Sequence, residues 1–198
     1  MKTLLIVTSI LLGIMILAQA FIYTSTNRTE QHKYVVLKKF DNFEVRQYAP
    51  AMFSSVKMVS DSYEATSSNG FRTLAGYIFG GNDKNEKIAM TSPVVMEIGD
   101  TTRMSFMVPS DMSKQDLPKP NNGRIYFEEQ GQKIMAAIEF GGWADDQNIE
   151  EYTNKLKASL KENGLTYRGK FSYLGYNPPY QVIGRRNEIV VELEGFEK

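Results

Sequence analysis

The chain has 198 residues, of which 42% are apolar and 12% aromatic, so it can bury one good hydrophobic core but is too short for two large domains. Its 23 basic and 23 acidic residues cancel, so no overall field attracts a polyanion and we expect no nucleic-acid partner. The absence of cysteine excludes disulfides and thiolate nucleophiles, and the single histidine, His32, leaves too little material for a catalytic triad or a multi-histidine metal site.

The N-terminal segment is predicted to be separate from the globular part. Lys2 precedes a predominantly apolar run from Leu4 to Leu17, and Ala18-Gln19-Ala20 matches the cleavage pattern of a secretory signal peptide. If cleavage does not occur, the apolar residues reach about residue 23, which approaches the roughly 20 residues that cross a bilayer, and residues 1–23 are a membrane anchor. In both cases we expect an exported protein, periplasmic or on the extracytoplasmic face of the inner membrane.

Residues 24–33 are polar and show no periodicity, which predicts a tether. The only histidine, His32, falls within it. A lone histidine in such a segment is usually a solvated linker residue, and the alternative is a ligand of a haem iron or a metal ion.

The first half of the globular part predicts three strands and a helix. Strands are expected at Tyr34–Phe40, Phe43–Tyr48 and Ala51–Val59, where apolar residues recur at the period of a strand. The period then changes to that of a helix, from about Ser62 to Phe79. The early turns of this helix carry a group of small residues, which indicates either close packing on a sheet or a groove left open for a ligand: Ala65, Thr66, Ser67, Ser68 and Gly70.

The second half repeats the same order. The first half ends with two further strands, Ile88–Met90 with Val94–Ile98 and Arg103–Pro109, and a loop at residues 110–123 follows. The second half then predicts two strands, a helix and two closing strands: Arg124–Glu129, Lys133–Phe140, a helix from about Asp145 to Gly164, Lys170–Tyr176 and Glu188–Leu193. The repeated order predicts an α+β domain with pseudo-twofold symmetry, each half laying one helix on an antiparallel sheet.

Four polar residues lie in one turn before the last strand. Arg185, Arg186 and Glu188 there either contact a ligand or form an arginine–carboxylate lock, and the lock is the more common arrangement.

Three motifs together resemble one known family. KIAMTSPV follows a Gly-Gly-Asn loop, GGW follows a strand, and YNPP is followed by RRNEI; in this order they resemble the SOUL family of haem-binding proteins, from about Tyr34 to Leu193. The resemblance implies a distorted antiparallel β-barrel of two four-stranded sheets, each with one helix, related to gyrase-inhibitor-like sensor domains. Residues 34–198 are accordingly expected to form the haem-binding domain.

The resemblance also implies a ligand and a site. The ligand is haem or another tetrapyrrole, held non-covalently in an apolar cleft beside the first helix of the domain. Because the domain contains no histidine, we expect no histidine ligation of the iron. Carried onto this chain, the cofactor-binding residues are Ser67, Phe71, Arg72, Leu74, Ile78 and Met90, with Lys57 as a second nearby cation for the haem propionates.

Two classes of function follow. The first is a carrier, buffer or sensor of a flat hydrophobic molecule, with no catalytic residues and no metal site built from the protein alone. The alternative is a hydrolase that uses a buried carboxylate, such as Glu97 or Glu139, together with a tyrosine in the same cleft.

Overall fold

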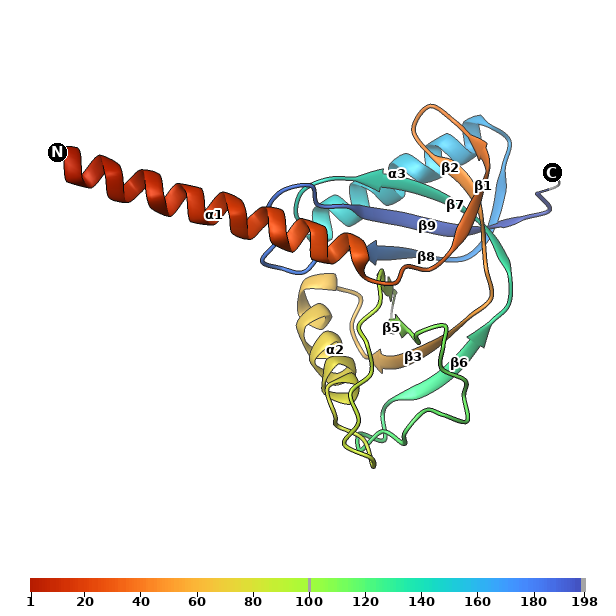
Figure 1. Ribbon diagram of the computed structural model, residues 1–198. Helices are drawn as coiled ribbons and strands as arrows, with labels where there is room; N and C mark the ends of the chain where they lie inside the picture. The colour runs from red at the N-terminus through yellow and green to blue at the C-terminus, as the bar shows by residue number, and fades with distance from the viewer. Residues whose placement is uncertain (100, 197–198) are drawn as a thin grey trace.

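The computed structural model describes residues 1–99 and 101–196 as a long N-terminal helix attached to an α+β domain with a curled sheet (Figure 1). In chain order the elements are α1 (Lys2–Arg28), β1 (Tyr34–Lys39), β2 (Glu44–Tyr48), β3 (Ala51–Met58), α2 (Tyr63–Ile78), β4 (Val94–Glu97), β5 (Thr102–Met107), β6 (Tyr126–Gln130), β7 (Lys133–Phe140), α3 (Asp146–Glu162), β8 (Thr166–Gly175) and β9 (Asn187–Glu194).

The nine strands form one antiparallel sheet in the order β1-β2-β7-β9-β8-β4-β5-β3-β6. This order contains two equivalent four-stranded units, β2-β7-β9-β8 and β6-β3-β5-β4. Each unit takes one strand from the other half of the chain: β2 of the first half pairs with β7, and β6 of the second half pairs with β3. The units meet where β4 pairs with β8, and β1 extends the outer edge. The predicted pseudo-twofold α+β fold is therefore confirmed, with the difference that hydrogen bonds join the two units into one continuous sheet.

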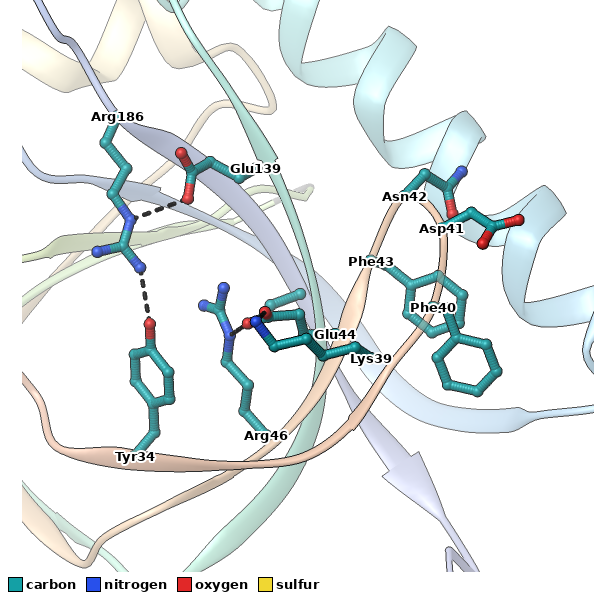
Figure 2. A pocket seen from close by; sticks show the side chains of 11 residues that line it. Tyr34, Lys39, Phe40, Asp41, Asn42, Phe43, Glu44, Arg46, Glu139 and Arg186 are labelled. Carbon is teal, nitrogen blue, oxygen red and sulfur yellow. Dashed lines mark hydrogen bonds and ion pairs between the residues drawn. The ribbon is translucent and has the colours of Figure 1, made fainter.

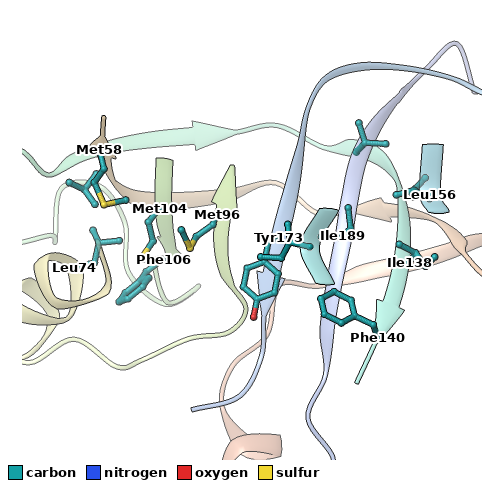
Figure 3. Close-up of a cluster of buried hydrophobic side chains, with 14 of the residues drawn as sticks. Met58, Leu74, Met96, Met104, Phe106, Ile138, Phe140, Leu156, Tyr173 and Ile189 are labelled. Carbon is teal, nitrogen blue, oxygen red and sulfur yellow. The ribbon is translucent and has the colours of Figure 1, made fainter. Parts of the chain in front are cut away.

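The helix α2 packs closely against β3 and β5. The Ser62 hydroxyl caps its N-terminus by accepting a hydrogen bond from the Ala65 amide at 3.1 Å. Figure 3 shows Leu74 of α2 directed toward Met58 and Met104 of the sheet. A Cβ added at Gly70 would lie 2.8 Å from the Met58 methyl carbon, so this glycine permits the close approach. At Gly70 the close-packing interpretation is therefore correct.

The second helix, α3, is tied to the start of α2. The Asp145 carboxylate caps α3 by accepting from the Asn148 amide at 2.7 Å. The next residue, Asp146, accepts from the Ser62 hydroxyl and from the Tyr63 amide, both at 2.6 Å. A single carboxylate thus joins the N-termini of the two pseudo-equivalent helices.

Three predictions differ from the structure by more than two residues. Residues 88–90 are not a strand, because the Ile88 amide donates to the Ile78 carbonyl at 2.8 Å and the chain then runs on without a ladder. β8 starts at Thr166, four residues before the predicted Lys170. α1 continues through Arg28, so the first part of the predicted tether is helical.

Candidate functional site

The sheet has one face covered by helices and one open face. Side chains alternate between the two faces along each strand, so Val56 and Met58 of β3 join the core under α2, while Ser55 and Lys57 point to the open face. Along β2 the same alternation puts Glu44, Arg46 and Tyr48 on the open face. This face carries many ionised side chains, in contrast to the apolar core in Figure 3.

At the centre of the open face lies a buried carboxylate. Glu188 accepts hydrogen bonds from Arg46 Nη1 at 2.8 Å, from Arg186 Nε at 3.0 Å and from the Tyr176 hydroxyl at 2.9 Å. Burial raises the pKa of the Tyr176 phenol far above its usual range and the adjacent carboxylate raises it further, so this phenol remains a hydrogen-bond donor. Of the predicted arginine–carboxylate lock, the contact of Arg186 with Glu188 is confirmed, and Arg46 joins it from β2. The prediction is wrong for Arg185, which donates to the carbonyls of Pro178 and Gln181.

The larger cavity opens beside this lock and has a volume of about 420 Å³ (Figure 2). This volume lies within the range of small-molecule pockets, about 300–1,000 Å³. Arg186 contacts Glu139 at 3.3 Å and donates to the Tyr34 hydroxyl at 3.0 Å, and Arg46 donates to Glu44 at 2.9 Å. The walls are these residues together with Lys39, Phe40, Asp41, Asn42, Phe43 and Ala137. The cavity is a poor match for the propionates of a tetrapyrrole, because the cations in its lining, Lys39, Arg46 and Arg186, already contact carboxylates.

His32 lines the second cavity of the open face, which has a volume of about 160 Å³. Its Nε2 lies 2.8 Å from the Ala49 carbonyl, and its ring packs against Tyr48 and Phe53 with centroid distances of 5.0 and 5.6 Å. Burial lowers the pKa of the imidazole, which is therefore neutral at pH 7. The prediction of a solvated linker residue is wrong, because Thr29–Lys33 docks on the domain. The Ser92 amide, for example, donates to the Glu30 carbonyl at 2.8 Å.

The predicted haem residues on α2 fall into two groups. Leu74 and Ile78 are fully buried on the side of α2 that packs against the sheet, so they support the helix from below and do not line an open cleft. Phe71 is 40% exposed and packs its other side on Phe106, with 5.3 Å between ring centroids. Ser67 is half-buried one turn before Phe71, at a spacing that puts both on the same edge of α2.

The remaining predicted residues are Arg72, Met90 and Lys57. Arg72 is exposed on α2, and Met90 is half-buried against the core. Lys57 lies over the ring of Tyr126, with 5.6 Å from its ammonium to the ring centroid, and so belongs to the open face and not to the α2 side of β3. Arg124, which sequence reasoning did not single out, donates to the Thr73 hydroxyl of α2 at 3.3 Å. Thr73 is two positions from Phe71 and therefore lies on another side of the helix.

The edge of α2 holds the predicted residues that a ligand could reach. Haem presents a flat apolar surface and two carboxylates, and α2 offers an exposed aromatic ring at Phe71 and, at the next position, the exposed side chain of Arg72. Among residues 1–99 and 101–196, no group of three or more histidine, aspartate or glutamate side chains is arranged to hold a metal ion. Binding at this edge would depend on apolar burial and charge.

Fold and site together define a class: an α+β domain with a curled antiparallel sheet that carries a cavity of small-molecule size on its open face. Residues 29–192 match the family described as SOUL heme-binding protein, and the chain belongs to this family. The resemblance inferred from KIAMTSPV, GGW and YNPP is thus confirmed.

Curated relatives agree with this assignment, and solved structures show a similar fold. Heme-binding protein 2 of Mus musculus and of Homo sapiens are each 31% identical to this chain over 157 residues, covering 75% of it and 76% of the relative. Among solved structures, the C-terminal domain of EcmrR superposes with a TM-score of 0.59 at 11% identity, over 78% of this chain and 98% of that one. A hydrolase from Listeria innocua gives a TM-score of 0.54 at 8% identity, over 80% and 94%. These two likenesses concern the fold alone.

Proposed function

We propose that the protein binds haem, or another flat hydrophobic molecule, non-covalently along the edge of α2, and serves outside the cytoplasm as its carrier, buffer or sensor. Family membership supports haem as the ligand class. The exposure of Phe71 supports this location: its aromatic ring is 40% exposed on a helix whose other apolar residues are largely buried. The half-buried Ser67 and Met90 extend the proposed site.

The residues of this edge divide the binding energy between burial and charge. Fully burying a phenylalanine side chain contributes about 1.5–3 kcal/mol, and because 40% of Phe71 is still exposed, covering it would contribute roughly 0.6–1.2 kcal/mol. The exposed Arg72, next to Phe71 in α2, would supply positive charge for a propionate. We expect no axial histidine at this edge, because His32 lies on the open face and its Nε2 faces a backbone carbonyl.

A haem titration of the full chain in lipid nanodiscs, corrected with empty nanodiscs, tests this proposal through the Soret band. We expect saturable one-to-one binding. The Phe71→Asp variant should raise Kd by at least roughly 3- to 8-fold, which corresponds to the loss of about 0.6–1.2 kcal/mol of apolar burial at a side chain that is 40% exposed. Tyr167→Asp is a matched control, because Tyr167 of β8 is an aromatic residue exposed to 39%. Equal losses in both variants, or none in either, would contradict a site on α2.

The alternative is a hydrolase. Glu139 faces the larger cavity and Glu97 the smaller one, as a carboxylate base would require. Each is paired with an arginine, however: Glu139 with Arg186 at 3.3 Å and Glu97 with Arg103 at 2.9 Å. These contacts favour a structural role. Turnover of nitrophenyl esters that is lost in Glu139→Gln or Glu97→Gln would support the hydrolase instead.

A further inference from the structure

The loop between β8 and β9 exposes an unusual concentration of apolar side chains. Tyr180, Val182 and Ile183 are 64%, 61% and 66% exposed, and Pro179 beside them is exposed as well. In contrast, Gln181, the polar residue among them, is buried. The loop therefore reverses the usual arrangement for water, in which polar side chains face outward.

This loop lies along the C-terminal half of α1 (Figure 1). Gln19 accepts from the Val182 amide at 3.0 Å and donates to the Tyr180 carbonyl at 3.2 Å, and Thr26 donates to the Gln181 side-chain oxygen at 2.9 Å. Residues 19, 23 and 26 form one stripe of the helix. Tyr23 lies so close that a Cβ at Gly184 would be 3.0 Å from its ring.

α1 is long and apolar enough to cross a membrane, with a mean hydropathy of 2.5 in its most apolar window and none of that window buried against the protein. Its N-terminal half projects away from the domain (Figure 1). Counted from Leu4, the roughly 20 residues needed for the hydrocarbon layer end near Tyr23. Gln19 is one turn deeper, about 6 Å along the axis. The backbone groups that Gln19 binds thus lie near the boundary of the hydrocarbon layer, on its inner side.

Several backbone groups of the loop are paired within the protein. A backbone amide or carbonyl at this depth cannot rely on water, so it needs a partner within the protein. Gln19 satisfies two such groups, and the Gln181 amide donates to the Ile183 carbonyl at 3.0 Å. Arg185 donates to the carbonyls of Pro178 and Gln181, both at 2.8 Å. Glutamine is costly in an apolar helix, and these contacts give Gln19 a structural reason to be there.

We propose that Pro178–Gly184 is a membrane-seated loop, which inserts Tyr180, Val182 and Ile183 into the interfacial layer of the bilayer that α1 crosses. Trp143 adds an aromatic side chain at the base of the loop, where the Arg185 guanidinium stacks 4.1 Å from its ring centroid. Tyrosine and tryptophan are the residues enriched at membrane interfaces. The loop and α1 together then hold the domain in one orientation on the membrane. The proposal rests on α1 remaining in the mature chain and does not depend on haem binding.

The experiment places a tryptophan reporter in the loop. Trp143 is the single tryptophan, so Trp143→Phe provides an empty background, in which Tyr180→Trp reports on the loop and Tyr167→Trp, on β8, is the control. The full-length variants are reconstituted in bilayers of phosphatidylcholine with or without bromine on the acyl chains. We expect at least twofold quenching of the tryptophan at position 180 by brominated lipid, and none at position 167.

Three results would overturn the proposal. The first is equally weak quenching at both positions. The second is a blue-shifted, unquenched emission at position 180 that grows with protein density in the bilayer, which would assign the loop to a second copy of the chain. The third is an intact mass showing cleavage after Ala20, because the mature chain would then lack Gln19.

Discussion

Arg46 and Glu188 form a buried ion pair, with 2.8 Å between Nη1 and Oε1, that ties β2 to β9 across the intervening β7. Burial by itself would lower the pKa of Arg46, but the Glu188 carboxylate outweighs this effect and holds that pKa above its usual value. Both side chains are almost completely inaccessible to water. The pair therefore connects β2, which comes from the first half of the chain, to β9, the last strand of the second half.

Removal of Arg46 is expected to destabilise the domain strongly. Breaking a buried pair by removing one partner costs about 3–5 kcal/mol when the remaining charge is uncompensated; Glu188 keeps Arg186 and Tyr176 as partners, so we expect a cost near the lower end, about 3 kcal/mol. At about 2–4 °C per kcal/mol for a domain of this size, Arg46→Met should lower Tm by roughly 6–12 °C. Lys155→Met, which breaks an exposed pair with Glu151, is the control and should leave Tm unchanged. Equal Tm values for the two variants, measured by circular dichroism, would refute this assignment.

Stability should fall on mild acidification because of His32. Burial lowers its pKa in the folded state below the ordinary value of 6.5, so the unfolded chain binds the proton more readily. The contribution of the neutral His32 to the free energy of unfolding is therefore fully present above pH 6.5. It is lost as the pH falls below that value, with a slope of up to about 1.4 kcal/mol per pH unit, until the folded-state pKa is reached. Carboxylates such as Glu44, whose pKa is lowered from 4.5, act only in more acidic solution.

This effect is measured as the change in Tm between pH 7.5 and pH 5.5. His32→Gln retains a donor for the Ala49 carbonyl but cannot titrate, so its Tm should change much less over this interval than that of the wild type. Since His32 is the only histidine, parallel Tm curves for the two proteins would show that its burial has been misjudged.

Two glycines of α2 should respond in opposite ways to substitution. Gly76 has open space around its Cα, so Gly76→Ala should stabilise the protein by about 0.5–1 kcal/mol through helix propensity. Gly70 faces Met58 and Met104, and Gly70→Leu should destabilise it by about 1–3 kcal/mol through overpacking. Chemical denaturation measures both. A neutral Gly70→Leu would indicate the open groove that the small residues of α2 also suggested.

Asp146 should contribute as a cap to a helix other than its own. Asp146→Ala removes the acceptor for the Ser62 hydroxyl and the Tyr63 amide, and loss of such a cap costs about 0.5–2 kcal/mol. Glu150→Ala, at an exposed position of α3, is the control. If hydrogen exchange at the start of α2 were equally fast in both variants, the contact between the helices would be unimportant.

Local sequence signals predicted the elements of this fold well. The change from strand to helix period at Ser62, the second helix expected from about Asp145 and the repeated order of elements led to the correct α+β pseudo-twofold class. The errors occurred where local pattern carries no information. Ile88 looks like a strand residue but hydrogen-bonds to the end of α2, and Thr24–Arg28 lacks an apolar period yet continues α1.

The sequence by itself determined the family, the two halves and the apolar N-terminus, because period, turn residues and motif order are properties of neighbouring residues. Only the tertiary structure decided which half each first strand joins, that His32 is packed against the sheet, and that Leu74 is core while Phe71 is exposed. It also decided that Gln19 meets the loop at Val182, more than 160 positions away. These outcomes depend on pairing and burial between distant segments, which local residue patterns do not encode.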